Sequence, residues 1–159
     1  MKNTVWNTKS LRYSKEMKYS DFITERKDAV ITRFDSPINE GAQPGWSFKN
    51  LLTKDVGSDI YLAYITLPFN NGHGYHAHSG SEIIYVLEGK LRSTYYSVKG
   101  EAVTNVLEPG DCIYAPEGTP HSVWNVGEKE CRFIVVKNPP YFLEDIPLPP
   151  ELNKKNLNP

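Results

Sequence analysis

The chain has 159 residues, of which 39% are hydrophobic, 23% charged and 12% aromatic, and its formal net charge at pH 7 is -1. This length favours a single domain, and the near-neutral charge provides no basic surface for the phosphate backbone of a nucleic acid. No segment approaches the roughly 20 consecutive apolar residues of a membrane-spanning helix. We therefore expect neither a nucleic acid nor a membrane as a partner.

The polar segment 1–27 predicts an irregular N-terminal extension without the continuous apolar core of a secretory signal, so we expect a cytoplasmic protein. From Asp28 onward, short β-branched and aromatic segments alternate with turns rich in Gly, Pro, Asn and Asp. These segments predict strands at 29–34, 46–52, 59–67, 75–78, 82–89, 90–98, 101–107, 111–116, 121–126 and 131–137.

Because no amphipathic helix separates these segments, the pattern favours antiparallel pairing in an all-β, single-domain barrel over residues 28–137. Cys112 and Cys131 lie inside strand-like segments and do not form a CxxC pair, so we expect two small buried side chains.

Residues 138–159 contain six of the twelve prolines and predict an extended, Pro-rich C-terminal tail. Its apolar residues, such as Tyr141 and Phe142, are expected to pack along the barrel or a neighbouring subunit. Because open sheet edges need cover, long segments on both sides of a barrel favour a homodimer.

The segment from Gly74 to Gly89 contains a candidate metal site. Side chains two residues apart on a strand point to the same face, so His76 and His78 aim in one direction, and Glu82 follows after a short turn. Imidazole nitrogen and carboxylate oxygen suit divalent transition metals. Two alternating histidines alone are weak support, but a second glycine-bounded turn delivers His121 to the start of another strand, and a barrel can bring it to the same interior point.

The two segments resemble the two motifs of the cupin superfamily, which together span residues 68–125 here. The first motif matches at His76, His78, Glu82 and Gly89, with Asn70 in place of its leading glycine. That replacement is mild, because Asn tolerates a left-handed backbone conformation. The second motif is matched in full by Gly110, Pro116, Gly118, His121 and Asn125.

This resemblance implies a small single-domain, metal-binding cupin with a double-stranded β-helix, or jelly-roll, fold. In metal-binding members, the positions of His76, His78, Glu82 and His121 hold one divalent transition metal and leave open positions for substrate, water or oxygen. Iron is favoured here, with Mn, Ni, Zn, Co and Cu as alternatives. Asn125 is expected to support a turn or a neighbouring residue rather than to bind the metal.

Three functions remain open, all with a small molecule as the partner. The leading interpretation is a mononuclear non-haem iron dioxygenase or related oxidoreductase. The second is a redox-neutral, metal-dependent lyase, decarboxylase or isomerase, and the third is a cupin that binds a metabolite without converting it.

Two residues are candidates for proton transfer at this site. His73 lies in a glycine-rich loop at the expected barrel mouth, and Tyr64 lies on the predicted strand 59–67. Strand alternation places Tyr64 and Tyr61 on opposite faces without deciding which face is inside. An inward-pointing Arg33 or Arg92 would favour an anionic substrate.

Overall fold

The computed structural model describes residues 29–43, 45–139 and 148. The predicted N-terminal extension at 1–27 and almost all of the Pro-rich tail at 138–159 lie outside the described residues. In the part of the chain that is described, no helix has the length and apolar character needed to cross a lipid bilayer.

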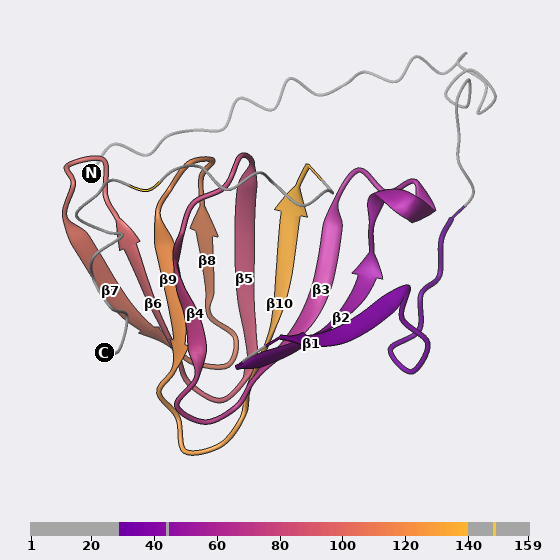
Figure 1. Cartoon of the computed structure of the whole chain (residues 1–159), viewed down its shortest axis with the longest axis horizontal. Coiled ribbons are helices and arrows are strands. Elements are labelled where there is room, and N and C mark those ends of the chain that lie inside the picture. Colours follow the sequence, from indigo (N-terminus) through magenta and orange to yellow (C-terminus); the bar gives the residue numbers. More distant parts are fainter. Residues whose placement is uncertain (1–28, 44, 140–147, 149–159) are drawn as a thin grey trace, which may run out of the picture.

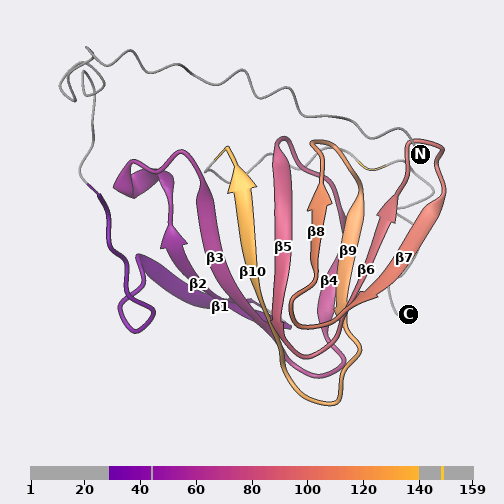
Figure 2. The same cartoon turned by 180° about the vertical axis from the view of Figure 1, so that it is seen from behind.

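The described residues form two antiparallel sheets, which confirms the predicted all-β jelly roll (Figures 1 and 2). The larger sheet has the order β1-β2-β3-β10-β5-β8, and the smaller has the order β4-β9-β6-β7. Their bounds are β1 (Asn39–Gln43), β2 (Trp46–Leu52), β3 (Tyr61–Leu67), β4 (Gly72–His76), β5 (Ser81–Glu88), β6 (Leu91–Tyr96), β7 (Ala102–Leu107), β8 (Cys112–Ala115), β9 (His121–Asn125) and β10 (Cys131–Asn138). A short 3-10 helix, η2 (Lys54–Val56), follows β2.

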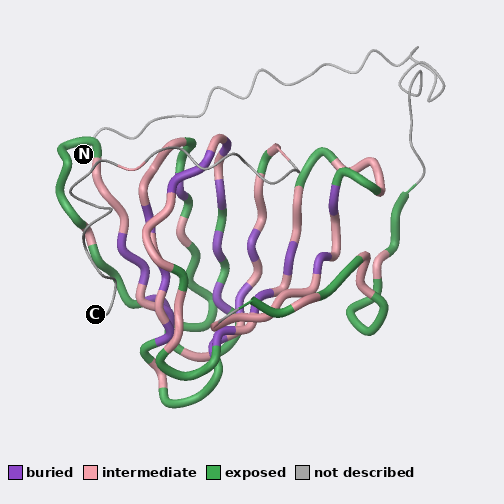
Figure 3. The backbone as a smooth tube through the Cα atoms, in the orientation of Figure 1, coloured by how far each residue is buried: buried purple, intermediate pink, exposed green. Residues whose placement is uncertain are grey.

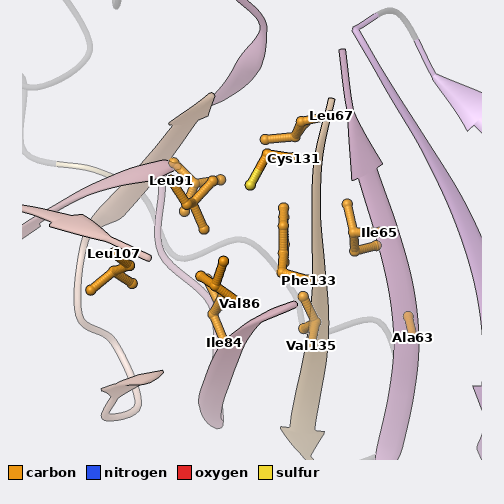
Figure 4. Close-up of a cluster of buried hydrophobic side chains, with 11 residues drawn as sticks. Ala63, Ile65, Leu67, Ile84, Val86, Leu91, Leu107, Cys131, Phe133 and Val135 are labelled. Atoms are coloured by element: carbon orange, nitrogen blue, oxygen red, sulfur yellow. The ribbon is translucent and has the colours of Figure 1, made fainter. Parts of the chain in front are cut away.

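The hydrophobic core fills the space between the two sheets. On the larger sheet, the register places Val135 of β10 between Ala63 of β3 and Ile84 of β5, and these three side chains are buried. The smaller sheet contributes Leu91, which Figure 4 shows facing the larger sheet's residues, and Val123 belongs to the same cluster. Buried and more exposed positions alternate along β3 and β5 because successive side chains point to opposite faces of a sheet (Figure 3).

The sequence placed the first strand wrongly. Residues 29–34 form no strand, and the β-pairing described for them is limited to an isolated bridge between Arg33 and Ser36. The first strand is instead β1, the polar segment NEGAQ, which pairs with β2 at the edge of the larger sheet. Local β-propensity favours AVITRF, but a strand also needs a neighbour to pair with, and only β1 has one.

The two cysteines also differ from each other. Cys131 is buried as expected, whereas Cys112 is exposed, and neither forms a disulfide. Cys112 begins β8, which has a single neighbour at the edge of the larger sheet, so its outward face has no cover from the described residues.

Two motif positions have clear structural roles. Asn70, which replaces the glycine of the first motif, has a φ of 54°, so it adopts the left-handed conformation that Asn tolerates. Gly89 has a φ of 87°, and a Cβ atom there would lie 2.8 Å from Cα of Cys131. Glycine is therefore needed at position 89 for both its conformation and the close approach of β10.

Asn125 joins the end of β3 to the turn between β9 and β10. Its side chain is almost fully buried, and its Nδ2 lies 2.7–3.0 Å from the carbonyl oxygens of Leu67, Pro68 and Lys129. Its Oδ1 accepts a hydrogen bond from the backbone N–H of Gly127 at 3.0 Å. Asn125 thus supports two turns through the main chain, which matches its expected role.

We expect Asn125→Ala to lower the free energy of unfolding by about 2 kcal/mol or more, because buried carbonyl oxygens lose their donor. Urea unfolding followed by circular dichroism measures this change. Asn105→Ala on the exposed part of β7 is the matched control and should change the stability by less than about 0.5 kcal/mol. Equal losses in the two variants would contradict the role of Asn125.

Candidate metal centre

Three predicted histidines converge on one point in the interior. His76 ends β4 and pairs in register with His121, the first residue of β9, while His78 follows two residues after His76. The ring centroids of His76 and His121 are 4.3 Å apart. One nitrogen from each of His76, His78 and His121 lies within 4.8 Å of the others. This spacing suits the binding of a single metal ion by all three imidazoles.

Glu82 reaches the same point from the opposite sheet. It lies near the start of β5, and its side chain is buried, as are those of His78 and His121. Its Oε2 lies 3.3 Å from Nε2 of His78, and its Oε1 lies 3.4 Å from Nε2 of His121. The fourth predicted ligand therefore faces the histidines across the barrel.

The ring nitrogens are arranged for metal binding. Nδ1 of His76 donates to the carbonyl oxygen of Gly74, and Nδ1 of His121 donates to that of Thr119, each at 2.8 Å. Because Nδ1 carries a proton in both rings, Nε2 is the nitrogen that offers a lone pair whenever the ring is neutral. Nε2 of His121 and both ring nitrogens of His78 are buried without a hydrogen-bond partner. Burying a polar atom without a hydrogen bond is energetically unfavourable, and a bound cation would satisfy the lone pairs that face it.

The protonation states also fit a metal ion. Burial, together with the imidazoles of His121 and His73, lowers the pKa of His76 to about 3, so this ring is neutral at pH 7. Burial raises the pKa of Glu82, but the imidazoles of His121 and His78 and the ammonium group of Lys137 outweigh it. The pKa of Glu82 is therefore held well below its usual value. A neutral imidazole and an ionised carboxylate are the ligand forms that a divalent ion requires.

A cavity of about 240 Å³ opens beside these residues. Most of its wall is apolar, and the four candidate ligands are among its polar residues. The lining consists of Trp46, Tyr61, Ile65, Leu67, His73, His76, His78, Glu82, Ile84, His121, Val123, Phe133, Val135 and Lys137. A concave apolar pocket with a few convergent polar groups is typical of a small-molecule site.

The two candidate catalytic residues lie in different places: one lines the cavity and the other does not. His73 is exposed and lines the cavity, with its ring centroid 4.2 Å from that of His76 and 6.1 Å from that of Trp46. Tyr64 instead lies on the outer face of the larger sheet, where its ring packs edge-on against Phe34 at 4.8 Å. Tyr64 is therefore not among the residues that contact a molecule in the cavity, and its position argues against the predicted catalytic role.

Sequence reasoning missed two polar residues of the cavity, Tyr61 and Lys137. Nζ of Lys137 lies 2.9 Å from Oε2 of Glu82, and β10 places Lys137 beside both Tyr61 and Glu82 in register. Burial and the charge of Glu82 raise the pKa of Tyr61 to about 12, so its hydroxyl is a neutral donor, here to Oδ1 of Asn50.

The cation in the cavity is thus Lys137, since neither Arg33 nor Arg92 belongs to the lining. Lys137 has the same strand parity as the apolar residues Phe133 and Val135. A lysine that shares its strand face with Cys131, Phe133 and Val135 was the signal available in the sequence.

Comparisons with known proteins identify the family of this chain. The family described as "Cupin domain" matches residues 63–137. The chain is 34% identical over 119 residues to the uncharacterized protein MJ1618 of Methanocaldococcus jannaschii, covering 73% of this chain and 91% of that protein. It is 36% identical over 115 residues to a germin-like protein of Morus alba, covering 72% of this chain but only 48% of that protein. The chain therefore belongs to the cupin superfamily.

Solved structures show the same fold. A variant of oxalate decarboxylase from Bacillus subtilis superposes with a TM-score of 0.65 at 21% identity, covering 78% of this chain and 34% of that one. Another structure of that enzyme, described for its Mn(II) centres, superposes with a TM-score of 0.64 at 20% identity, covering 74% of this chain and 32% of that one. The chain spans about a third of the length of this structural relative.

We expect His78→Ala to weaken binding of Mn(II) or Fe(II) by more than about 100-fold, because it removes a ligand nitrogen rather than a supporting contact. Metal content after dialysis, together with isothermal titration, measures the change. His73→Ala is the matched control: His73 stacks on His76 but is outside the ligand group, so this variant should keep a full equivalent of metal. Retention of that equivalent by His78→Ala would contradict the site.

Proposed function

We propose that this protein is a divalent-metal-dependent enzyme that converts a small organic molecule in the cavity. The observation that carries this proposal is the set of buried imidazole nitrogens without hydrogen-bond partners that face an ionised carboxylate beside an apolar pocket. His76, His78 and His121 would hold the ion through Nε2, and Glu82 would hold it through a carboxylate oxygen.

The leading reaction class is an iron-dependent dioxygenase or related oxidoreductase. A bound ion would polarise the substrate and, as Fe(II), would also provide the redox chemistry of an oxygenase. Three nitrogen ligands and one oxygen ligand leave positions free in a six-coordinate shell. The apolar residues of the cavity, such as Phe133 and Val135, would keep bulk water from the reacting groups.

A redox-neutral, metal-dependent decarboxylase or lyase is the second candidate. His73 favours it, because an imidazole on the wall of the cavity can accept or donate a proton near neutral pH. The Mn(II) centres named for oxalate decarboxylase of Bacillus subtilis are compatible with this class, although that likeness concerns the fold alone.

Nitric oxide tests whether an iron ion in this site has an open position. We expect the Fe(II)-loaded protein to bind nitric oxide under argon and to give the EPR signal of a high-spin iron nitrosyl. The signal should persist in Tyr64→Phe, because Tyr64 lies on the outer face, and should disappear in His78→Ala. A metal-loaded protein without this signal would contradict an open site.

Turnover assays separate the reaction classes. A panel of small carboxylic acids is offered to the Fe(II) and Mn(II) forms, in air and under argon, with an oxygen electrode and mass spectrometry of the products. Turnover that consumes oxygen supports the dioxygenase, whereas turnover under argon supports the second candidate. Binding of these acids without any product would contradict both and favour a metabolite-binding protein.

The homodimer and the cytoplasmic location expected from the sequence stay predictions. Light scattering of the purified chain measures its mass in solution and tests the first of them directly.

A further inference from the structure

Lys137 places a positive charge in the wall of the cavity. Its side chain is 24% exposed, and its ammonium group lies 2.9 Å from Oε2 of Glu82. An ammonium group has three N–H donors, whereas the contact with Glu82 needs only one. Lys137 can therefore hold the carboxylate of Glu82 and, at the same time, donate to an acceptor on a molecule in the cavity.

The balance of charge in the cavity favours an anion. In the described part of the chain, Glu82 is the only acidic residue that lines the cavity, and Lys137 is the only lysine or arginine. A divalent ion and the ammonium group of Lys137 would together carry three positive charges, and the single carboxylate of Glu82 would offset only one of them. Because the surrounding wall is apolar, this excess is poorly screened by solvent and attracts a negatively charged ligand.

The rest of the wall favours an apolar body for that ligand. Ile65, Phe133 and Val135 line the cavity from the larger sheet, Val123 lines it from the smaller sheet, and Trp46 adds an indole ring. The side chains of Ile65, Phe133, Val135 and Val123 have no polar atom, so a second carboxylate that lies against them would be buried at a cost.

We propose that the cavity selects small carboxylic acids with an apolar body, and that Lys137 holds the carboxylate beside the metal ion. This inference rests on the proposed metal-dependent function and defines the substrate class of the same site. Lys137 is thus the residue that determines the charge of the substrate, while residues such as Phe133 and Trp46 contact its hydrocarbon part.

Benzoate and benzamide test this inference, because they share one ring and differ in charge. With the Mn(II)-loaded protein, isothermal titration should give a dissociation constant at least about tenfold lower for benzoate than for benzamide. Lys137→Met should weaken benzoate binding by at least about tenfold and leave benzamide binding within about twofold, while Lys137→Arg should keep the preference for benzoate.

Lys90→Met is the matched control, because Lys90 is exposed and pairs with Glu108 on the surface. It should bind benzoate as the unmodified protein does. The Mn(II) content of each sample is measured, and variants are compared at equal occupancy, since Lys137 also contacts Glu82.

The results distinguish failure of the proposed role of Lys137 from failure of the proposed metal-dependent function. If the protein holds Mn(II) but binds benzoate no more tightly than benzamide, or if Lys137→Met leaves the preference unchanged, the role of Lys137 is overturned while the metal site stands. Tighter binding of oxalate than of benzoate would overturn the apolar substrate class. If the protein holds no metal, the proposed function fails, and the same two ligands measured on the metal-free form decide whether Lys137 still selects an anion.

Discussion

The buried carboxylate of Glu82 imposes the main electrostatic constraint on this structure. An ionised carboxylate in an apolar interior is strongly unfavourable unless cations or polar groups surround it. Its partners come from separate parts of the chain: Lys137 from the neighbouring strand of the larger sheet, His121 from the smaller sheet, and His78 from the segment after β4. These contacts join the two sheets at the site, whereas hydrocarbon contacts and the hydrogen bonds of Asn125 join them elsewhere.

Strand register places the polar residues of the site and the apolar residues of the core in separate rows of the larger sheet. Tyr61, Lys137 and Glu82 form one polar row across β3, β10 and β5, and the next inward row consists of Ala63, Val135 and Ile84. The site therefore sits directly on the hydrophobic core, which holds its strands in place. A slip of one residue in β10 would turn Lys137 outward and move Val135 with it, so the core also protects the register of the site.

The ligand set was predicted from local spacing together with the resemblance to the two cupin motifs. The spacing of His76 and His78 depends only on strand alternation, and the glycines around His121 indicate the turn that positions it. The face of Tyr64 could not be decided in this way, because alternation separates two faces without saying which one is inside. The position of Lys137 beside Glu82 follows from the pairing of β10 with β5, which is distant in sequence, so local patterns could not predict it. The strand conformation of β1 likewise follows from its pairing with β2, since the residues of β1 are polar.

The hydrogen bonds at Nδ1 of His76 and His121 have a consequence for protein engineering. In each case the acceptor is the carbonyl oxygen two residues earlier in the chain, at Gly74 and Thr119. The orientation of each ring is thus encoded within a tripeptide, Gly-Tyr-His in one strand and Thr-Pro-His before the other. We expect such tripeptides, grafted at facing positions of another antiparallel pair, to bring this ring alignment with them into a new scaffold.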